Sequence, residues 1–403
     1  MGRTVQAWVT SGSEFLGVTT PFAVDIPWWA EVEPVVDQLE HQLGVPVWVL
    51  RLLSNDGGES GCDGHVVYHV EALRTPVPGL LNPSPGERGR LCADEPMRVP
   101  WARVDGLREL LAWAHAAAAA AGRPVTGPMV QRRTWNLGTL CRLPTTGGPL
   151  WLKATPHFAA DEAAVIAGFA ATDPSLVPRV LARGDRRILM DDIPGQDCTT
   201  AAPATVHAVI TRFVAAQATL IARRPAGLRD WRPEALAARV RQLLDGPVRD
   251  ELTACEHATA YALAGRWEEL AECGLPDTVV HGDFHPGNWR SGAGAPVVLD
   301  FADSHWGNPV LDGLRAYDYL PEPLRATAVH AWTAAWSAHV PNADPGRALA
   351  VAEPLAHLVY AVRYQEFLDG IEPDEHPYHR GDPATAIRHA VHYTNNPSPH
   401  LQP

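Results

Sequence analysis

The feature that most constrains the fold is a change in hydrophobic periodicity near residue 195. Between residues 127 and 191 the chain reads as two pairs of short apolar runs with a helical stretch at 157–171 between them. Gly147 and Gly148 supply a turn between the first two runs. Most of the later chain has the spacing of amphipathic helices, at 203–224, 233–245, 253–272, 323–339, 346–369 and 384–393. We therefore expect an α+β fold with a small β-rich lobe, a linker at 191–195 and a large helical lobe.

The first 125 residues predict an additional α+β module. A helix is expected at 29–43, strands at 46–53 and 65–73, and a second helix from 105 to 121. Gly122 and Pro124 end that second helix, as these residue types commonly do. The predicted domains are therefore an accessory module at 1–125, the small lobe at 126–193 and the helical lobe at 194–403.

Composition excludes several classes of protein. The chain has 403 residues and a formal net charge of −13, which argues against nucleic-acid binding because that requires a basic surface. We find no uninterrupted apolar run of about 18 residues, which a membrane span needs, and no secretory signal at the N-terminus. The six cysteines are scattered without a CxxC pair, as is typical of reduced cytosolic thiols. We expect a cytoplasmic protein.

The segment HGDFHPGNWR at 281–290 is the strongest candidate for chemistry. Three interpretations compete. His281, Asp283 and His285 alternate, so an extended chain would present two histidines and a carboxylate to a metal. Asp283 alone could act as a nucleophile that forms an acyl-phosphate. The H-x-D-x-x-x-x-N spacing also matches a kinase catalytic loop, in which Asp283 faces the acceptor hydroxyl and Asn288 binds magnesium.

The rest of the sequence favours phosphoryl transfer. A second acid for magnesium is available at Asp300, at the end of the apolar run in VVLDFAD. Lys153 is the only lysine in the chain, and it lies on an expected strand, WLKA. Glu162, or Asp161, opens the following helix and would pair with that lysine. The metal and nucleophile interpretations do not explain Lys153, Asn288 and Asp300 together.

The segments TWNLGT, WLKA, ILMDDIPG, HGDFHPGN and VVLDFAD, in this order, resemble the aminoglycoside phosphotransferase and choline kinase-like family. The resemblance covers roughly residues 127–370. It implies the bilobal protein-kinase-like fold, Mg²⁺ as cofactor and ATP or GTP as phosphoryl donor. The phosphate-covering turn departs from a glycine-rich loop because it contains only Gly138, and Ala302 replaces the glycine of a D-F-G sequence.

The resemblance also implies roles for individual residues. Asp283 would be the catalytic base or the group that orients the acceptor hydroxyl, and Asp312 would brace the loop without doing chemistry. The magnesium ligands would be Asn288 and Asp300. The nucleotide would be bound by Lys153, which pairs with Glu162, by the turn that holds Asn136, Gly138 and Thr139, and by main-chain groups from Asp191 to Ile193.

The acceptor side is predicted less directly. His285, Asp303 and Trp306 flank the expected acceptor position, and Glu372 is the first choice among the C-terminal acids. Those acids either bind ammonium groups of an acceptor or form a solvated helix end, and both interpretations stay open. The acids are Glu366, Asp369, Glu372, Asp374 and Glu375.

The expected function is transfer of the γ-phosphate of ATP or GTP to a hydroxyl of an antibiotic of the aminoglycoside or nucleoside type, giving resistance or self-protection. The alternatives are a metabolic kinase for a sugar, amino sugar or amino alcohol, and a non-catalytic pseudokinase-like binding protein. Clustered acids around the acceptor would favour a polycation, whereas aromatic and neutral groups would favour a sugar or nucleoside. The expected partners are a nucleotide and a small hydroxylated acceptor, without nucleic acid or membrane, in a monomer or homodimer.

Overall fold

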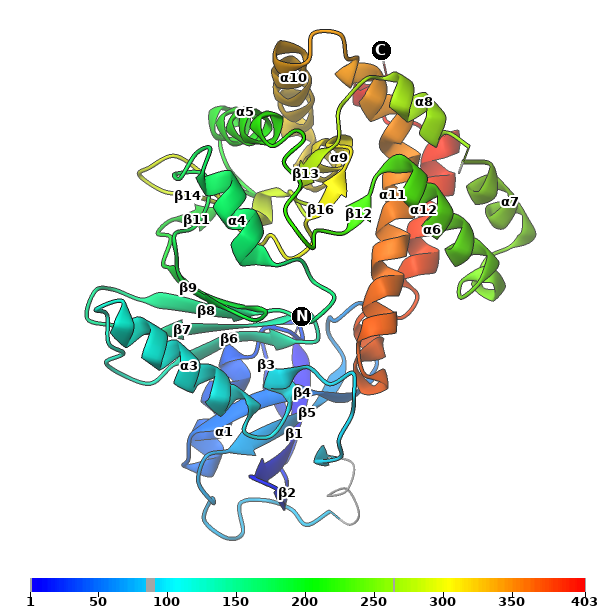
Figure 1. Cartoon of the computed structure of the whole chain (residues 1–403). Helices are drawn as coiled ribbons and strands as arrows, with labels where there is room; N and C mark the ends of the chain where they lie inside the picture. The colour runs from blue at the N-terminus through cyan, green and yellow to red at the C-terminus, as the bar shows by residue number, and fades with distance from the viewer. Residues whose placement is uncertain (1, 85–90, 264, 403) are drawn as a thin grey trace. The chain divides into compact units, whose positions relative to one another are not determined.

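The computed structural model describes residues 2–84, 91–263 and 265–402, and the chain divides into two compact units (Figure 1). Unit 1 comprises Met1–Phe158, Leu181–Asp191 and Glu366–Arg380. Unit 2 comprises Ala159–Val180, Asp192–Gln365 and Gly381–Pro403. Among the described residues, no helix is both long enough and apolar enough to cross a membrane.

The first sheet of unit 1 is built on strand β1, which our sequence analysis missed. Its residues Val5, Ala7 and Val9 alternate with more exposed ones and are fully buried, so the period-two signal was present. The sheet has the order β2-β1-β5-β4, with β3 beside β1; β1 is parallel to β5, and its partners β2 and β3 are antiparallel to it. The strand bounds are β1 Arg3–Ser11, β2 Glu14–Val18, β3 Phe22–Val24, β4 Val47–Asp56 and β5 His65–Ala72.

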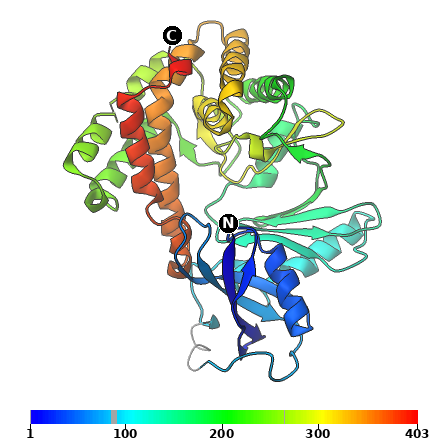
Figure 2. The same cartoon turned by 180° about the vertical axis from the view of Figure 1, so that it is seen from behind.

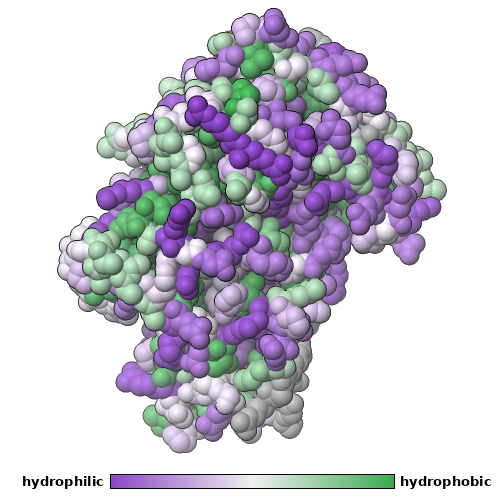
Figure 3. Space-filling model, in the orientation of Figure 1, coloured by the Kyte–Doolittle hydropathy of each residue, from purple (hydrophilic) through white to green (hydrophobic). Residues whose placement is uncertain are grey.

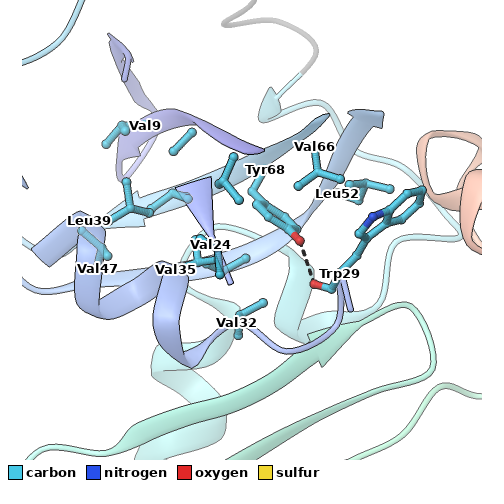
Figure 4. Close-up of a cluster of buried hydrophobic side chains, with 14 of the residues drawn as sticks. Val9, Val24, Trp29, Val32, Val35, Leu39, Val47, Leu52, Val66 and Tyr68 are labelled. Carbon is cyan, nitrogen blue, oxygen red and sulfur yellow. Dashed lines mark hydrogen bonds between the residues drawn. The ribbon is translucent and has the colours of Figure 1, made fainter. Parts of the chain in front are cut away.

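Helix α1, Glu33–Leu43, covers this sheet and completes its core. The helix begins four residues later than predicted, and Pro34 occupies its first turn, where a missing N–H costs nothing. Its buried residues pack against the strands around Tyr68, whose hydroxyl donates a hydrogen bond to the carbonyl of Trp29 at 2.7 Å (Figure 4).

The second sheet of unit 1 has the order β6-β7-β8-β10-β9 and is covered by helix α3, Gly106–Ala120 (Figures 1 and 2). The sequence predicted a single strand before the turn at Gly147, but two strands, β6 and β7, precede it. The strand bounds are β6 Val130–Trp135, β7 Gly138–Leu143, β8 Leu150–Ala154, β9 Val180–Gly184 and β10 Arg187–Asp191. Lys153 lies on β8, opposite Leu140 of β7 and Ile188 of β10.

The two sheets of unit 1 are joined by a buried pair of hydrogen bonds. The amide of Gln131 on β6 accepts from the N–H of Val49 on β4 at 3.0 Å and donates to the carbonyl of Val49 at 2.7 Å. Residues 1–125 therefore share a compact unit with the strands that follow them. Their folding as a separate module stays a prediction.

Unit 1 also contains a buried network of arginines and carboxylates, which we call the arginine network: Arg51, Arg98, Glu372, Asp374 and Glu375. The guanidinium of Arg98 donates to both carboxylate oxygens of Glu372, at distances from 2.8 to 3.1 Å. The N–H of Leu52 donates a hydrogen bond to the carboxylate of Glu375, a residue that is only 2% exposed. This network ties the short 3-10 helices η1, Pro100–Ala102, and η4, Pro373–Tyr378, to strand β4.

Unit 2 is mainly helical, as expected. The region 253–272 forms two helices rather than the single one predicted. The bounds are α4 Glu162–Ala170, α5 Pro203–Thr219, α6 Pro233–Asp245, α7 Ala254–Leu263, α8 Trp267–Glu272, α9 Val310–Tyr319, α10 Glu322–His339, α11 Pro345–Gly370 and α12 Asp382–Asn395, with short 3-10 helices at η2 Arg249–Glu251, η3 Pro286–Asn288 and η5 Pro399–Leu401. In Figures 1 and 2 α11 and α12 lie side by side.

Two small sheets in unit 2 support the candidate loop. One has the order β11-β14-β15 and the other β12-β16-β13. The bounds are β11 Gln196–Asp197, β12 Asp230–Trp231, β13 Thr278–Val280, β14 Trp289–Ser291, β15 Val297–Val298 and β16 His305–Gly307. The loop at 281–288 therefore begins at the end of β13 and ends at the start of β14. Hydrophilic residues are spread over the face of the molecule seen in Figure 3, with smaller hydrophobic areas between them.

Candidate active site

A stack of buried aromatic rings fixes the candidate loop to the helices of unit 2. Phe284, in the middle of the loop, is stacked on Phe213 of α5, with ring centroids 4.2 Å apart. Phe213 is in turn stacked on Phe169 of α4 at 4.9 Å, and Phe169 contacts Phe301 at 5.3 Å. Phe284 and Phe301 immediately follow Asp283 and Asp300, so one apolar core positions both acids.

Asp312 braces the first turn of the loop, as the family resemblance implied. Its carboxylate is buried at the start of α9 and accepts the backbone N–H groups of His281 at 2.8 Å and Gly282 at 3.0 Å. It also accepts the side-chain amide of Gln217 at 2.8 Å. Gly282 has φ of 85°, and a Cβ atom there would lie 2.4 Å from the carbonyl oxygen of Asp303, so glycine is required.

His281 is a structural residue of the loop and not a metal ligand. Its Nδ1 accepts the N–H of Asp283 at 3.2 Å, so Nε2 carries the proton and donates to the carbonyl of Leu299 at 2.9 Å. Burial lowers the pKa of His281 to about 4, so the ring is neutral. Among the described residues, no group of three or more His, Cys, Asp and Glu is arranged to hold a metal ion, which argues against the His-Asp-His interpretation.

The carboxylate of Asp283 is the most heavily bonded acid of the loop. Its Oδ1 accepts two N–H groups from the guanidinium of Arg315 of α9, at 2.8 and 2.7 Å. Its Oδ2 accepts the side-chain amide of Asn288 at 2.9 Å and lies 3.3 Å from Nε2 of His285. The Nδ1 of His285 accepts the N–H of Gly287, so Nε2 is the nitrogen that donates to Asp283.

These contacts keep Asp283 ionised. Burial by itself would raise the pKa of Asp283, but the charge of Arg315 and the hydrogen bonds from His285 and Arg315 outweigh it. The resulting pKa lies well below the usual range for aspartate. Asp283 is therefore a weak base that is well suited to orient a hydroxyl group and to stabilise positive charge beside it.

Asn288 and Asp300 are brought together by the backbone. The N–H of Leu299 donates to the carbonyl of Asn288 at 2.8 Å, and the N–H of Phe301 donates to the carboxylate of Glu162 at 3.0 Å. Asp300, between them, has φ of 65°, a left-handed conformation that is uncommon outside glycine and is often found at functional sites.

The oxygen donors of this pair fit a magnesium ion. The amide nitrogen of Asn288 is used by Asp283, so its amide oxygen is the atom available to a cation. Together with the carboxylate of Asp300 it provides the oxygen ligands that magnesium prefers. Glu162, which was predicted to pair with Lys153, accepts a hydrogen bond from the N–H of Phe301, the residue after Asp300. Its pairing with Lys153, a residue of unit 1, stays a prediction.

Two predicted nucleotide-binding residues of unit 1, Asn136 and Thr139, have buried side chains. The amide of Asn136 donates to the carbonyl of Glu375 at 3.4 Å, and its oxygen lies 3.1 Å from the ring of His379. The hydroxyl of Thr139 lies 2.9 Å from that of Thr134. Nucleotide contacts from this turn would therefore use its main chain, and they stay a prediction.

Three further residues that were predicted to bind the nucleotide lie at the ends of strands or in the linker. Gly138 begins β7, where a Cβ atom would lie 3.1 Å from the carbonyl of Ala154. Asp191 ends β10 and is ion-paired with Arg123. Ile193 follows in the linker, and the predicted contact of its main chain with the nucleotide base stays a prediction.

The predicted acceptor residues are divided between the two units. In unit 2, His285 contacts Asp283, Asp303 lies against Gly282 and is paired with Arg363, and Trp306 on β16 is only 9% exposed. Glu372 belongs to unit 1, is 3% exposed and is bound by Arg98. Because its carboxylate is already matched in the arginine network, we leave Glu372 out of the acceptor site.

Sequence reasoning missed Arg315, which makes the shortest contacts to Asp283. Arg315 follows Asp312 by three residues on α9, so the two side chains share a helical face. Asp312 was expected to brace the loop, and this spacing was the signal that a second residue of the same helix reaches it.

The comparisons define the class of protein to which this fold and site belong. A model of the phosphotransferase enzyme family matches residues 119–350, more than half of the chain, so the chain belongs to this family. It is therefore a phosphotransferase that uses a hydroxyl group as acceptor, as the sequence predicted. A sequence comparison with curated proteins finds no match.

Several solved structures are similar to this chain, and the first of them shows a kinase-like α+β fold. A choline/ethanolamine kinase family protein from Mesorhizobium loti has a TM-score of 0.51 and 16% identity, over 72% of this chain and 98% of that one. A macrolide 2'-phosphotransferase from Brachybacterium faecium has a TM-score of 0.44 and 19% identity, over 67% and 98%. A choline kinase from Streptococcus pneumoniae has a TM-score of 0.48 and 12% identity, over 71% and 100%. The family model and the Mesorhizobium loti structure confirm the expected fold class.

Proposed function

We propose that this enzyme transfers the γ-phosphoryl group of ATP or GTP to a hydroxyl of a small molecule, with an antibiotic of the aminoglycoside or nucleoside type as the expected acceptor. The observation that carries the proposal is the bonding of Asp283 by Arg315, Asn288 and His285, which holds one carboxylate ionised and oriented. Positioning and charge stabilisation are the main demands of phosphoryl transfer.

In the proposed reaction the acceptor oxygen forms a bond to the γ-phosphorus, and the bond from that phosphorus to the β–γ bridging oxygen breaks. The products are a phosphate monoester and a nucleoside diphosphate. Asp283 orients the acceptor hydroxyl through a hydrogen bond, and the hydroxyl proton leaves past its carboxylate to water. Because the pKa of Asp283 is low, it does not retain this proton.

Magnesium would be held by the amide oxygen of Asn288 and the carboxylate of Asp300, and when bound it neutralises charge on the phosphates. The backbone bonds from Leu299 and Phe301 support this proposal, because they hold the chain on either side of Asp300 in place. The role of Lys153 on the nucleotide phosphates is part of the same proposal.

The experiment is a phosphorylation screen with purified enzyme. ATP and GTP are each offered with aminoglycosides, nucleosides, sugars and amino alcohols, and the phosphorylated product is identified by mass spectrometry, with and without EDTA. The proposal expects a product that carries one added phosphoryl group and whose formation stops when the divalent metal is removed. The second candidate, a metabolic sugar or amino-alcohol kinase, is distinguished by which acceptor has the highest kcat/KM. Binding of nucleotide without any transfer would favour a non-catalytic binding protein.

A further inference from the structure

An exposed aromatic surface lies directly beside Asp283. The ring of Tyr319, at the end of α9, is 48% exposed and is stacked on the ring of His285, with centroids 4.6 Å apart and planes 30° from parallel. His285 in turn lies 3.3 Å from the carboxylate of Asp283. We call Tyr319 and His285 the aromatic flank. The ring of Tyr319 is therefore exposed to solvent, and the side chain of His285 lies between it and the reacting carboxylate of Asp283.

Arg315 packs against the ring of Tyr319 in the aromatic flank. Its guanidinium carbon lies 4.3 Å from the ring centroid of Tyr319 and 4.8 Å from that of Tyr360 on α11, so it is held between two tyrosines. The same guanidinium donates both hydrogen bonds to Asp283. The cation–π contact and the ion pair therefore fix Tyr319 relative to Asp283.

The charges near Asp283 do not suit a polycationic acceptor. Asp283 is matched by Arg315, and Asp303 is matched by Arg363. A cationic acceptor beside Asp283 would also meet the positive guanidinium of Arg315, and like charges at such distances repel.

Three of the five C-terminal acids that were predicted as possible partners of ammonium groups are bonded to arginines or buried in the structure. Glu372 is bonded by Arg98, and Asp374 lies 3.4 Å from the guanidinium of Arg51. Glu375 is buried, and burial raises its pKa to about 8, so it carries little charge at neutral pH. These three acids therefore belong to the arginine network of unit 1.

We infer that the acceptor is an uncharged, hydroxylated compound with a flat ring face, and that this ring stacks on Tyr319 while its hydroxyl meets Asp283. A nucleoside is the simplest compound of this class. The inference rests on the proposed phosphoryl transfer and selects one acceptor class among those that the function allows. Tyr319 is then a specificity-determining residue of the acceptor site.

The test compares acceptors and one matched pair of variants in the full-length enzyme. Uridine and cytidine represent the uncharged ring compounds, kanamycin the polycations and choline the small cations. Tyr319→Ala is compared with Tyr319→Phe, which keeps the ring. Tyr261→Ala is the control, because Tyr261 on α7 is 41% exposed and also lies against a histidine, His257, with centroids 5.7 Å apart.

The inference expects the nucleosides to have the highest kcat/KM. Tyr319→Ala should raise their KM by about 10-fold, the loss typical of one aromatic stacking partner, with the KM for ATP unchanged. Tyr319→Phe, which keeps the ring, should restore most of the nucleoside binding that Tyr319→Ala loses, and Tyr261→Ala should behave as the wild type. A higher kcat/KM for kanamycin or choline, or an unchanged nucleoside KM in Tyr319→Ala, would overturn the inference and leave the phosphotransferase function standing.

A binding measurement separates this inference from the proposed function. Isothermal titration calorimetry of uridine with the wild type and Tyr319→Ala reports the acceptor site without turnover. Weaker binding in Tyr319→Ala supports the aromatic flank even if no phosphate is transferred, in which case only the proposed function fails. Absence of uridine binding by the wild type would contradict the inference.

Discussion

Arg315→Met is expected to raise the pKa of Asp283, which in the wild type lies well below the usual range for aspartate. In the wild type, Arg315 donates two hydrogen bonds to Asp283 and supplies the largest opposing charge to the effect of burial on its pKa. With the guanidinium removed, burial raises the pKa of Asp283 and only Asn288 and His285 oppose the rise. Because Asp283 must be ionised to accept the acceptor hydroxyl, activity should fall as the pH is lowered.

The magnitude follows from the two bonds that are lost. Hydrogen bonds to a charged group contribute about 1.5–3 kcal/mol each when buried. The side chains of Arg315 and Asp283 are 15% and 24% exposed, so the lower end applies. A loss of about 3 kcal/mol corresponds to a fall in kcat of about 100-fold if orientation of Asp283 is fully lost, and about 10-fold if Asn288 retains part of it.

The assay is the pH profile of kcat/KM between pH 5 and 9, with ATP and the best acceptor from the screen. The wild type should show no acid limb from Asp283, whereas Arg315→Met should lose activity toward the acid end of this range, because the pKa of Asp283 is raised. Arg315→Lys, which keeps the charge but not the two-pronged geometry, should lie between them. Arg347→Met is the matched control, because Arg347 forms an exposed pair with Glu272 elsewhere in unit 2. Wild-type kcat and an unchanged profile in a folded Arg315→Met protein would refute the role assigned to Arg315.

Three further changes test other parts of the account. Glu372→Ala should lower the free energy of unfolding in urea by about 3–5 kcal/mol, because the buried charge of Arg98 loses its partner, whereas the exposed Glu272→Ala should change it little. Burial raises the pKa of Glu375 to about 8 from an ordinary value of 4.5, so the folded state binds the proton more tightly than the unfolded state does. The free energy of unfolding should therefore decline as the pH rises between these two values. Glu375→Gln should flatten this decline, and an equal slope in both proteins would contradict the prediction. Lys153→Arg should impair turnover despite keeping the charge, and near-normal kinetics in that variant would remove the special role of the only lysine.

The sequence predicted the parts of the fold whose periodicity is local. Helices such as α6 and α11 were placed to within one residue, because a helix carries its pattern within a few turns. Strand β1 was missed although the alternation of Val5, Ala7 and Val9 signals a strand, and its pairing with β5, some sixty residues later, has no local signal. Its burial depends on that distant partner, and no local pattern reveals the pairing.

The candidate site was predictable where a motif keeps its members close in sequence. Asp283 and Asn288 lie within one loop, and their hydrogen bond follows from that spacing. Arg315 lies on a separate helix and reaches Asp283 only through the packing of α9 against the loop. Glu372, the first choice among the C-terminal acids for acceptor contact, is bound by Arg98, 274 residues away in the chain, and the local sequence gives no sign of that partner.

The central claim is that Asp283 organises transfer of a phosphoryl group to a hydroxyl. The most direct test is the turnover number of Asp283→Asn, measured by phosphate incorporation into the acceptor, beside nucleotide binding by the same protein. The account predicts a loss in kcat of about 10²–10⁴-fold with nucleotide binding retained. Asp250→Asn, an exposed acid on the short helix η2, should leave both unchanged. Full turnover in a folded Asp283→Asn enzyme would contradict the account.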